Sequence, residues 1–249
     1  MRSRIRAQVN HLFIKYPSLG HYGYDFLRLS GLDRSTKGTK PFFKKLARRG
    51  FSPQMILDIG ANHGGWSRLV NSVFKDAHFF LIEPQLEMRP FLDKFCSQSP
   101  RAKWILAGAG AEKGELMLTV WDDYQGSAFI SPEIQRLTPH KRQRLVPVVA
   151  VDDLVASGEF STPDLIKIDV QGFELEVLRG AIGCLGITEI ILVETSLFHP
   201  LGQRPNIYRL IEMMEAYGYY IFDLTDLKYR RASGALGQVD ICFIHRSIR

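Results

Sequence analysis

The chain has 249 residues, of which 45% are hydrophobic and 23% are charged. This length and composition suit one folded domain with a small extension, and they exclude a disordered, collagen-like or coiled-coil protein. No run approaches the roughly 20 uninterrupted apolar residues of a membrane-spanning helix. Three widely spaced cysteines without a C-x-x-C pair argue against a disulfide framework or a structural zinc site. Because the basic start also lacks the apolar run of a secretory signal, we expect a cytoplasmic protein.

The net charge of +6 is concentrated at the start of the chain. Residues 1–50 hold 12 Lys and Arg against 2 acidic residues, whereas residues 51–249 hold 20 against 24. We expect residues 1–50 to form a basic N-terminal helical cap, with helices over Ile5–Phe13 and Pro41–Arg49, and residues 51–249 to form the main domain. Such a cap suits attraction of a substrate or of an anionic membrane surface, or a contact in a homo-oligomer. A non-catalytic nucleic-acid-binding protein is a weaker alternative, since aromatic and basic residues are not interleaved there.

Beyond residue 50, short apolar runs alternate with amphipathic stretches. The runs expected to be strands are Met55–Asp58, Phe79–Glu83, Trp104–Ala107, Leu165–Asp169, Ile190–Glu194, Tyr219–Asp223 and Asp240–His245. The stretches expected to be helices are Trp66–Phe74, Pro84–Phe95, Phe173–Leu185 and Ile207–Tyr217. Because strands that are covered on both faces are continuously apolar, this alternation predicts an α/β fold with a parallel sheet. The last two runs leave no room for a helix between them and predict an antiparallel hairpin at one edge.

Two further stretches interrupt the alternation. Gly114–Trp121 alternates apolar and polar residues enough to predict an additional strand. Asp122–Arg144 is polar and irregular, which predicts a loop or a short helix over the carboxyl edge of the sheet.

A glycine turn follows the first predicted strand. Ile56–Trp66 reads I-L-D-I-G-A-N-H-G-G-W, and ligands of open α/β sheets bind near such turns. A dinucleotide fingerprint starting at Gly60 would need a glycine where the chain has Asn62, and no P-loop motif follows. An NAD-dependent oxidoreductase is therefore a disfavoured alternative. Asp58 and the small turn residues up to Gly64 instead suit S-adenosylmethionine, a cofactor with an ammonium group and a ribose but no phosphates.

The second predicted strand ends in Glu83, 25 residues after Asp58. A carboxylate at this place can accept hydrogen bonds from both ribose hydroxyls. The alternative interpretation is that Glu83 only caps the helix expected to begin at Pro84. We predict that the cofactor is bound by Asp58, Gly60, Ala61, Asn62, Gly64, Glu83, Pro84 and Asp169.

Four segments of the chain resemble the FkbM family of methyltransferases. They are Asp58–Gly64 (D-I-G-A-N-H-G), Ile82–Pro84 (I-E-P), Ile166–Ala181 (I-K-I-D-V-Q-G-F-E, then L-R-G-A) and Val193–Glu194, within a resemblance that covers about residues 51–245. The resemblance implies a Rossmann-like class I methyltransferase fold, with a mostly parallel seven-stranded sheet whose last strand is antiparallel. It also implies S-adenosyl-L-methionine as the cofactor and O-methylation of a sugar, glycolipid or polyketide-type hydroxyl. Gln171 departs from the family's usual Glu, which puts in doubt a carboxylate role at that position.

Transfer of a methyl group to a hydroxyl gains from a general base that accepts the hydroxyl proton. Asp169 and Glu194 end neighbouring strands in this fold, and His199 follows in a loop with a side chain that titrates near neutrality. We predict that these three candidate catalytic residues converge in one cleft, and we leave open which of them is the base. Each has an alternative role as a helix cap or a surface residue. No metal is expected from the histidine and cysteine spacing, although carboxylates on adjacent strands keep that question open.

Overall fold

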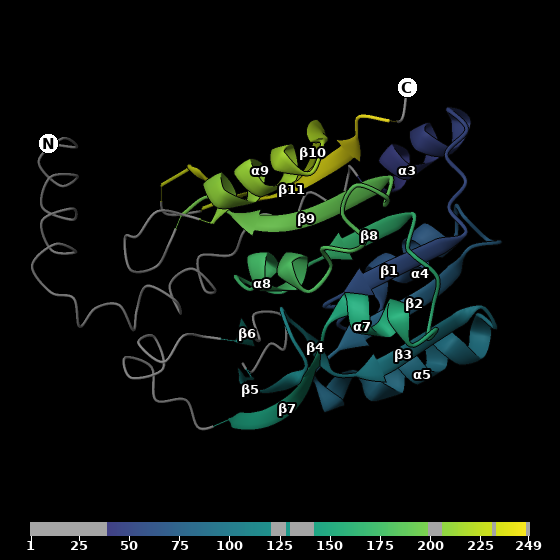
Figure 1. Cartoon of the computed structure of the whole chain (residues 1–249), viewed down its shortest axis with the longest axis vertical. Coiled ribbons are helices and arrows are strands. Elements are labelled where there is room, and N and C mark those ends of the chain that lie inside the picture. The colour runs from purple at the N-terminus through teal and green to yellow at the C-terminus, as the bar shows by residue number, and fades with distance from the viewer. Residues whose placement is uncertain (1–38, 121–127, 130–141, 199–205, 231–232, 248–249) are drawn as a thin grey trace, which may run out of the picture.

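The computed structural model describes residues 39–120, 128–129, 142–198, 206–230 and 233–247. They build a seven-stranded sheet in the order β10-β11-β9-β8-β1-β2-β3 (Figure 1). Five strands are parallel: β1 (Met55–Ile59), β2 (His78–Glu83), β3 (Ala102–Leu106), β8 (Leu165–Ile168) and β9 (Ile190–Ser196). Strand β11 (Leu236–His245) pairs antiparallel with both β9 and β10 (Tyr219–Tyr229). The predicted α/β fold and its antiparallel edge hairpin are therefore confirmed.

Helices cover both faces of this sheet, which explains why its central strands are mostly apolar, with Asp58 of β1 and Lys167 of β8 as buried exceptions. Every residue of β1 and of β8 is buried. Leu57 and Ile59 of β1 join one hydrophobic core, whereas Ile56 joins the core on the opposite face. The first core is closed by α7 (Val151–Ala156), α8 (Glu174–Arg179) and α9 (Ile207–Ala216). The second is closed by α3 (Thr39–Arg48), α4 (Gly65–Asn71) and α5 (Arg89–Gln98), the last preceded by the 3-10 turn η2 (Leu86–Met88).

The predicted helices are present with shifted bounds: α4 ends at Asn71 rather than Phe74, α5 begins at Arg89 rather than Pro84, and α8 is the most shortened. The stretch Phe173–Leu185 forms α8 only as far as Arg179, and turns follow it. At Gly180 an added Cβ would lie 1.9 Å from the backbone oxygen of Gly110, so the chain is in backbone contact with its neighbour there. A residue with a side chain at position 180 would therefore clash with that neighbour.

A second, four-stranded sheet in the order β4-β7-β5-β6 stands beside the first. It contains β4 (Gly108–Ala109), β5 (Gly114–Thr119), β6 (Ala128–Phe129) and β7 (Gln143–Val149). Strand β5 confirms the additional strand that was predicted. The expectation of a loop or helix over Asp122–Arg144 is wrong at residues 128–129 and 143–144, which pair with β5. Most of that segment lies outside the described residues.

Helix α3 confirms the helix predicted over Pro41–Arg49 and packs into the main domain. The Phe43 side chain is fully buried, with its ring edge-to-face against Trp66 at 5.6 Å and Phe74 at 6.1 Å between centroids. Thr39 Oγ1 donates a hydrogen bond to Asp226 Oδ2 at 3.0 Å, which ties the start of α3 to β10. The other predicted helix, Ile5–Phe13, lies outside the described residues, and the division of the chain at residue 50 stays a prediction.

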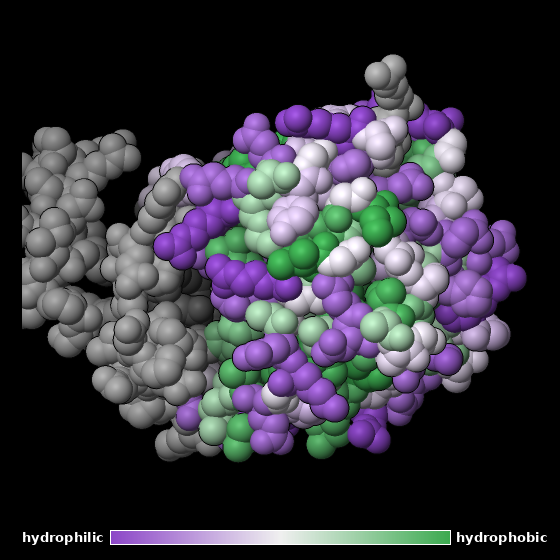
Figure 2. Space-filling view, viewed as in Figure 1, coloured by the Kyte–Doolittle hydropathy of each residue, from purple (hydrophilic) through white to green (hydrophobic). Residues whose placement is uncertain are grey.

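The surface of the domain is mixed in character. Figure 2 shows hydrophobic and hydrophilic residues interspersed over the face viewed in Figure 1, and scattered apolar residues of this kind are ordinary on protein surfaces. Within the described ranges, no helix combines the length and the apolar character needed to cross a membrane.

Candidate active site

The glycine turn after β1 packs directly against the end of β8. Gly60 has a φ of 78°, and a Cβ added there would lie 1.9 Å from the backbone oxygen of Asp169. The Asp169 N–H in turn donates to the Ile59 carbonyl at 2.9 Å. Only glycine combines this left-handed conformation with so close an approach. Gly60 therefore sets the distance between the turn and the strand end that carries Asp169.

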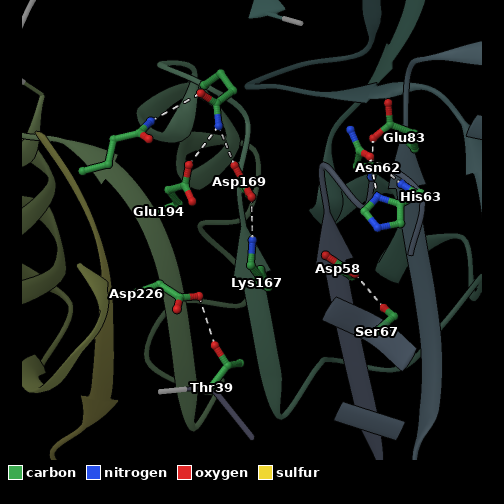
Figure 3. Close-up of polar contacts among 12 residues, drawn as sticks. Thr39, Asp58, Asn62, His63, Ser67, Glu83, Lys167, Asp169, Glu194 and Asp226 are labelled. Atoms are coloured by element: carbon green, nitrogen blue, oxygen red, sulfur yellow. Dashed lines mark hydrogen bonds and ion pairs between the residues drawn. The ribbon is translucent and has the colours of Figure 1, made fainter. Parts of the chain in front are cut away.

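Glu83, the last residue of β2, holds the same turn from the other side. Its side chain is 2% exposed, and its two oxygens accept the backbone N–H groups of Asn62 at 2.7 Å and of Gln85 at 2.9 Å. Burial raises the pKa of the Glu83 carboxyl to about 7, despite the stabilising hydrogen bonds from Asn62 and Gln85. The contact with Gln85 fits the capping interpretation, whereas the contact with Asn62 places the carboxylate at the predicted cofactor turn (Figure 3).

A pocket opens at the carboxyl ends of β1, β2 and β8. Its lining combines the glycine turn, the end of β2 and the second sheet, and consists of Ile59, Gly60, Asn62, Ile82, Glu83, Pro84, Gln85, Ala107, Gly108, Ala109, Leu118, Phe129, Asp169, Val170 and Gln171. Five of the predicted cofactor residues line this pocket, namely Gly60, Asn62, Glu83, Pro84 and Asp169. The second-sheet residues and Gln171 were missed, because the sequence offered no signal that the second sheet folds back over the glycine turn.

The remaining predicted cofactor residues do not line the pocket. Asp58 is 1% exposed and accepts a hydrogen bond from Ser67 Oγ of α4 at 2.6 Å, while its other oxygen has no hydrogen-bond partner. Burial raises the pKa of the Asp58 carboxyl to about 6, although the nearby Lys167 charge and the Ser67 hydrogen bond act in the opposite direction. Ala61 and Gly64 are also buried, so the cofactor roles of these three residues stay predictions.

The candidate catalytic carboxylates Asp169 and Glu194 meet at the carboxyl edge, as their strands predicted (Figure 3). The Gln171 amide nitrogen donates to both, at 2.8 Å to Asp169 Oδ1 and 3.0 Å to Glu194 Oε1. Each acid is also paired with a lysine that sequence reasoning missed: Lys167 Nζ lies 3.0 Å from Asp169 Oδ2, and Lys228 pairs with Glu194 Oε2. The third candidate, His199, lies outside the described residues.

These charges determine how readily Asp169 takes up a proton. Burial alone would raise the pKa of the Asp169 carboxyl, but Lys167, Lys228 and the Gln171 hydrogen bond hold it below its ordinary value. In the part of the chain that the structure describes, no group of three or more His, Cys, Asp or Glu side chains is arranged to hold a metal ion.

The sheet order and the pocket define the class of protein. An open, mostly parallel sheet with an antiparallel strand beside β9 and a pocket at the ends of β1 and β2 is the Rossmann-like class I methyltransferase fold. A family model described as the methyltransferase FkbM domain matches residues 58–221. The chain belongs to the FkbM methyltransferase family, and this family and fold imply S-adenosylmethionine as the methyl donor.

Two of the proteins that are similar to this chain are described as methyltransferases. The hexuronic acid methyltransferase AglP of Haloferax volcanii is 23% identical over 165 residues, which are 65% of this chain and 64% of that protein. The chain thus aligns with slightly less than two thirds of that relative. A solved structure from Klebsiella pneumoniae, described as a "putative O-methyltransferase", superposes with a TM-score of 0.51 at 15% identity and covers 96% of each chain. At this identity the likeness shows the fold alone.

Proposed function

We propose that this methyltransferase transfers a methyl group from S-adenosylmethionine to a hydroxyl of a sugar or a sugar-containing acceptor. The observation that carries the proposal is the pocket in which the Glu83 carboxylate and the glycine turn meet at the ends of β1 and β2. The likeness to a hexuronic acid methyltransferase supports a sugar acceptor. A polyketide-type hydroxyl is the second acceptor class, implied by the family resemblance.

The residues of the pocket fit the methyl donor in their chemistry. Glu83 offers carboxylate oxygens to ribose hydroxyls, and Gly60 leaves the turn without a side chain at its closest approach. Asp169, whose pKa is held below its ordinary value, also supplies negative charge, which suits a donor that carries a sulfonium and an ammonium group. When bound, the donor supplies an activated methyl group for in-line displacement, so the protein's tasks are to align the acceptor and to exclude water.

The two described carboxylates are poorly suited to the role of general base. Both oxygens of Glu194 are engaged by Gln171 and Lys228, and the pKa of Asp169 is held below its ordinary value. A base that works near neutral pH needs a pKa close to that range. We therefore keep His199 as the proposed base, with Asp169 and Glu194 shaping the charge of the cleft.

We expect Glu83→Ala to weaken binding of S-adenosylhomocysteine by about 1–3 kcal/mol, because a buried charge-assisted hydrogen-bond acceptor is lost. Isothermal titration calorimetry measures this, with the exposed Glu115→Ala as a control of equal charge change. Since Glu83 also holds the turn, Glu83→Gln is measured in parallel, and the melting temperature reports whether each variant is folded. Unchanged affinity in a folded Glu83→Ala protein would remove Glu83 from the cofactor site.

The acceptor is tested by incubating the protein with S-adenosylmethionine and a panel of glycosides, hexuronic acids and polyketide-type alcohols. Mass spectrometry should detect the gain of one methyl group on a sugar hydroxyl. We expect His199→Ala to lower this turnover about 10²-fold or more while the affinity for S-adenosylhomocysteine is retained. Turnover close to wild type in His199→Ala would move the base elsewhere, and methylation of the non-sugar alcohols alone would reject the sugar acceptor.

A further inference from the structure

Gln171 occupies a backbone conformation that a glutamine rarely adopts. Its φ of 55° lies in the left-handed region, in the turn between β8 and α8. Such a conformation is strained for a residue with a side chain, and it persists where the surroundings hold the residue in place. The contacts of the Gln171 side chain show what holds it.

Both the nitrogen and the oxygen of the Gln171 side-chain amide make hydrogen bonds. An amide nitrogen carries two protons, and here one is donated to Asp169 and the other to Glu194, at 2.8 and 3.0 Å. The amide oxygen faces the Gln238 amide nitrogen of β11 at 3.4 Å. Only an amide of this length supplies two donors toward the acids and an acceptor toward Gln238. An ionised glutamate of the same shape would supply neither donor.

Gln171 is a neutral side chain among closely spaced charged groups. Asp169 lies between Gln171 and Lys167, and Glu194 lies between Gln171 and Lys228. The Lys167 and Glu194 side chains are 6% and 8% exposed, so water screens their charges poorly. The titratable and charged groups around this position are Lys167 of β8, Asp169 directly after β8, Glu194 of β9, Lys228 of β10, Asp240 of β11 and Glu174 of α8.

We propose that Gln171 is a positioning residue that holds the Asp169 and Glu194 carboxyl groups side by side at the carboxyl edge of the sheet. It acts through the two acids: its amide nitrogen links Asp169, which follows β8 and lines the pocket, to Glu194 of β9. If the proposed function is correct, this positioning role bears on methyl transfer. The hydrogen bonds themselves do not depend on the proposed function.

The test compares melting temperatures of the full chain without ligand. At pH 8 we expect Gln171→Glu to melt about 5 °C or more below wild type, because a third carboxylate replaces two donors. At pH 5.5 the deficit should fall to less than half. The introduced carboxyl, whose pKa its acidic neighbours raise, takes up a proton as the pH falls and can then donate one hydrogen bond. Gln98→Glu, an exposed position on α5, makes the same charge change and should shift the melting temperature little at either pH.

A double variant keeps the proposal testable even if Gln171→Glu is strongly destabilised. Gln171→Glu combined with Glu194→Gln has the same number of acidic side chains as the wild type, and it again has one amide next to them, now at position 194. We expect it to melt higher than Gln171→Glu alone at pH 8, which is the coupling that a charge-specific role requires. A double variant that melts no higher, or a single-variant deficit equal at both pH values, overturns the proposal. Binding of S-adenosylhomocysteine to the wild type is measured separately, so a failure of the proposed function is distinguishable.

Discussion

Replacing Gly60 with alanine is expected to destabilise the domain by more than about 4 kcal/mol or to prevent folding. The added Cβ would lie 1.9 Å from the Asp169 backbone oxygen, and the φ of 78° is itself unfavourable for alanine. The neighbouring atom belongs to the backbone of a central strand end, so it cannot move aside without disturbing the pairing of β1 with β8. Overpacking of this kind, combined with backbone strain, lies at the severe end of single substitutions.

Gly158 offers a matched control for this prediction. It has the same φ of 78°, but nothing lies within 4 Å of the Cβ that alanine would add. Gly158→Ala therefore carries only the conformational cost, about 1 kcal/mol. Chemical denaturation of both variants measures the difference. Equal losses of unfolding free energy would show that the turn tolerates the side chain and that the contact with β8 is not what requires glycine.

Replacing Lys167 with methionine is expected to cost about 3–5 kcal/mol of unfolding free energy at pH 8, the range found when one partner of a buried ion pair is removed. Lys167 is 5% exposed and pairs with Asp169 at 3.0 Å. Burial alone would lower the pKa of its ammonium, but the charges of Asp169, Asp240, Asp58 and Glu194 raise it above its ordinary value. Without the ammonium these acids would be left as buried, uncompensated charges.

The pH dependence separates this effect from lost packing. In Lys167→Met the buried acids, led by Asp58 and Asp169, should have raised pKa values, so the folded state takes up protons as the pH falls. The deficit relative to wild type should therefore shrink between pH 8 and pH 5. Lys94→Met, at an exposed position of α5, is the control and should change stability by less than about 0.5 kcal/mol. A loss in Lys167→Met that is the same at both pH values would assign Lys167 a packing role alone.

Much of the fold could be predicted because its signals are local. Strands β1 and β8 are short, mostly apolar runs without strict alternation, a pattern typical of strands covered on both faces. The absence of a helix-length segment before β11 predicted the hairpin with β10 in the same way. Gly60 and Glu83 were predicted for the site because the turn after β1 and the end of β2 have fixed places in an open α/β sheet.

Other features depend on which strands become neighbours, and no local pattern carries that information. Lys167 stands within an apolar run. Its partner Asp169 is only two residues away, but Asp58 and Glu194 come close to it only through the pairing of β8 with β1 and β9. The second sheet supplies Leu118 and Phe129 to the pocket, although the sequence around residue 129 is polar and irregular.

The sequence by itself determined the chain order of the seven main-sheet strands, the glycine turn and the family motifs, because hydrophobic periodicity and backbone requirements act over a few residues. The tertiary structure decided that α3 packs into the main core, that the second sheet walls the pocket, and that Gln171 bridges Asp169 and Glu194. Each of these depends on contacts between residues far apart in the chain. The strength of a buried charge or hydrogen bond is set by what surrounds it in space, and those surroundings exist only once the sheet has formed.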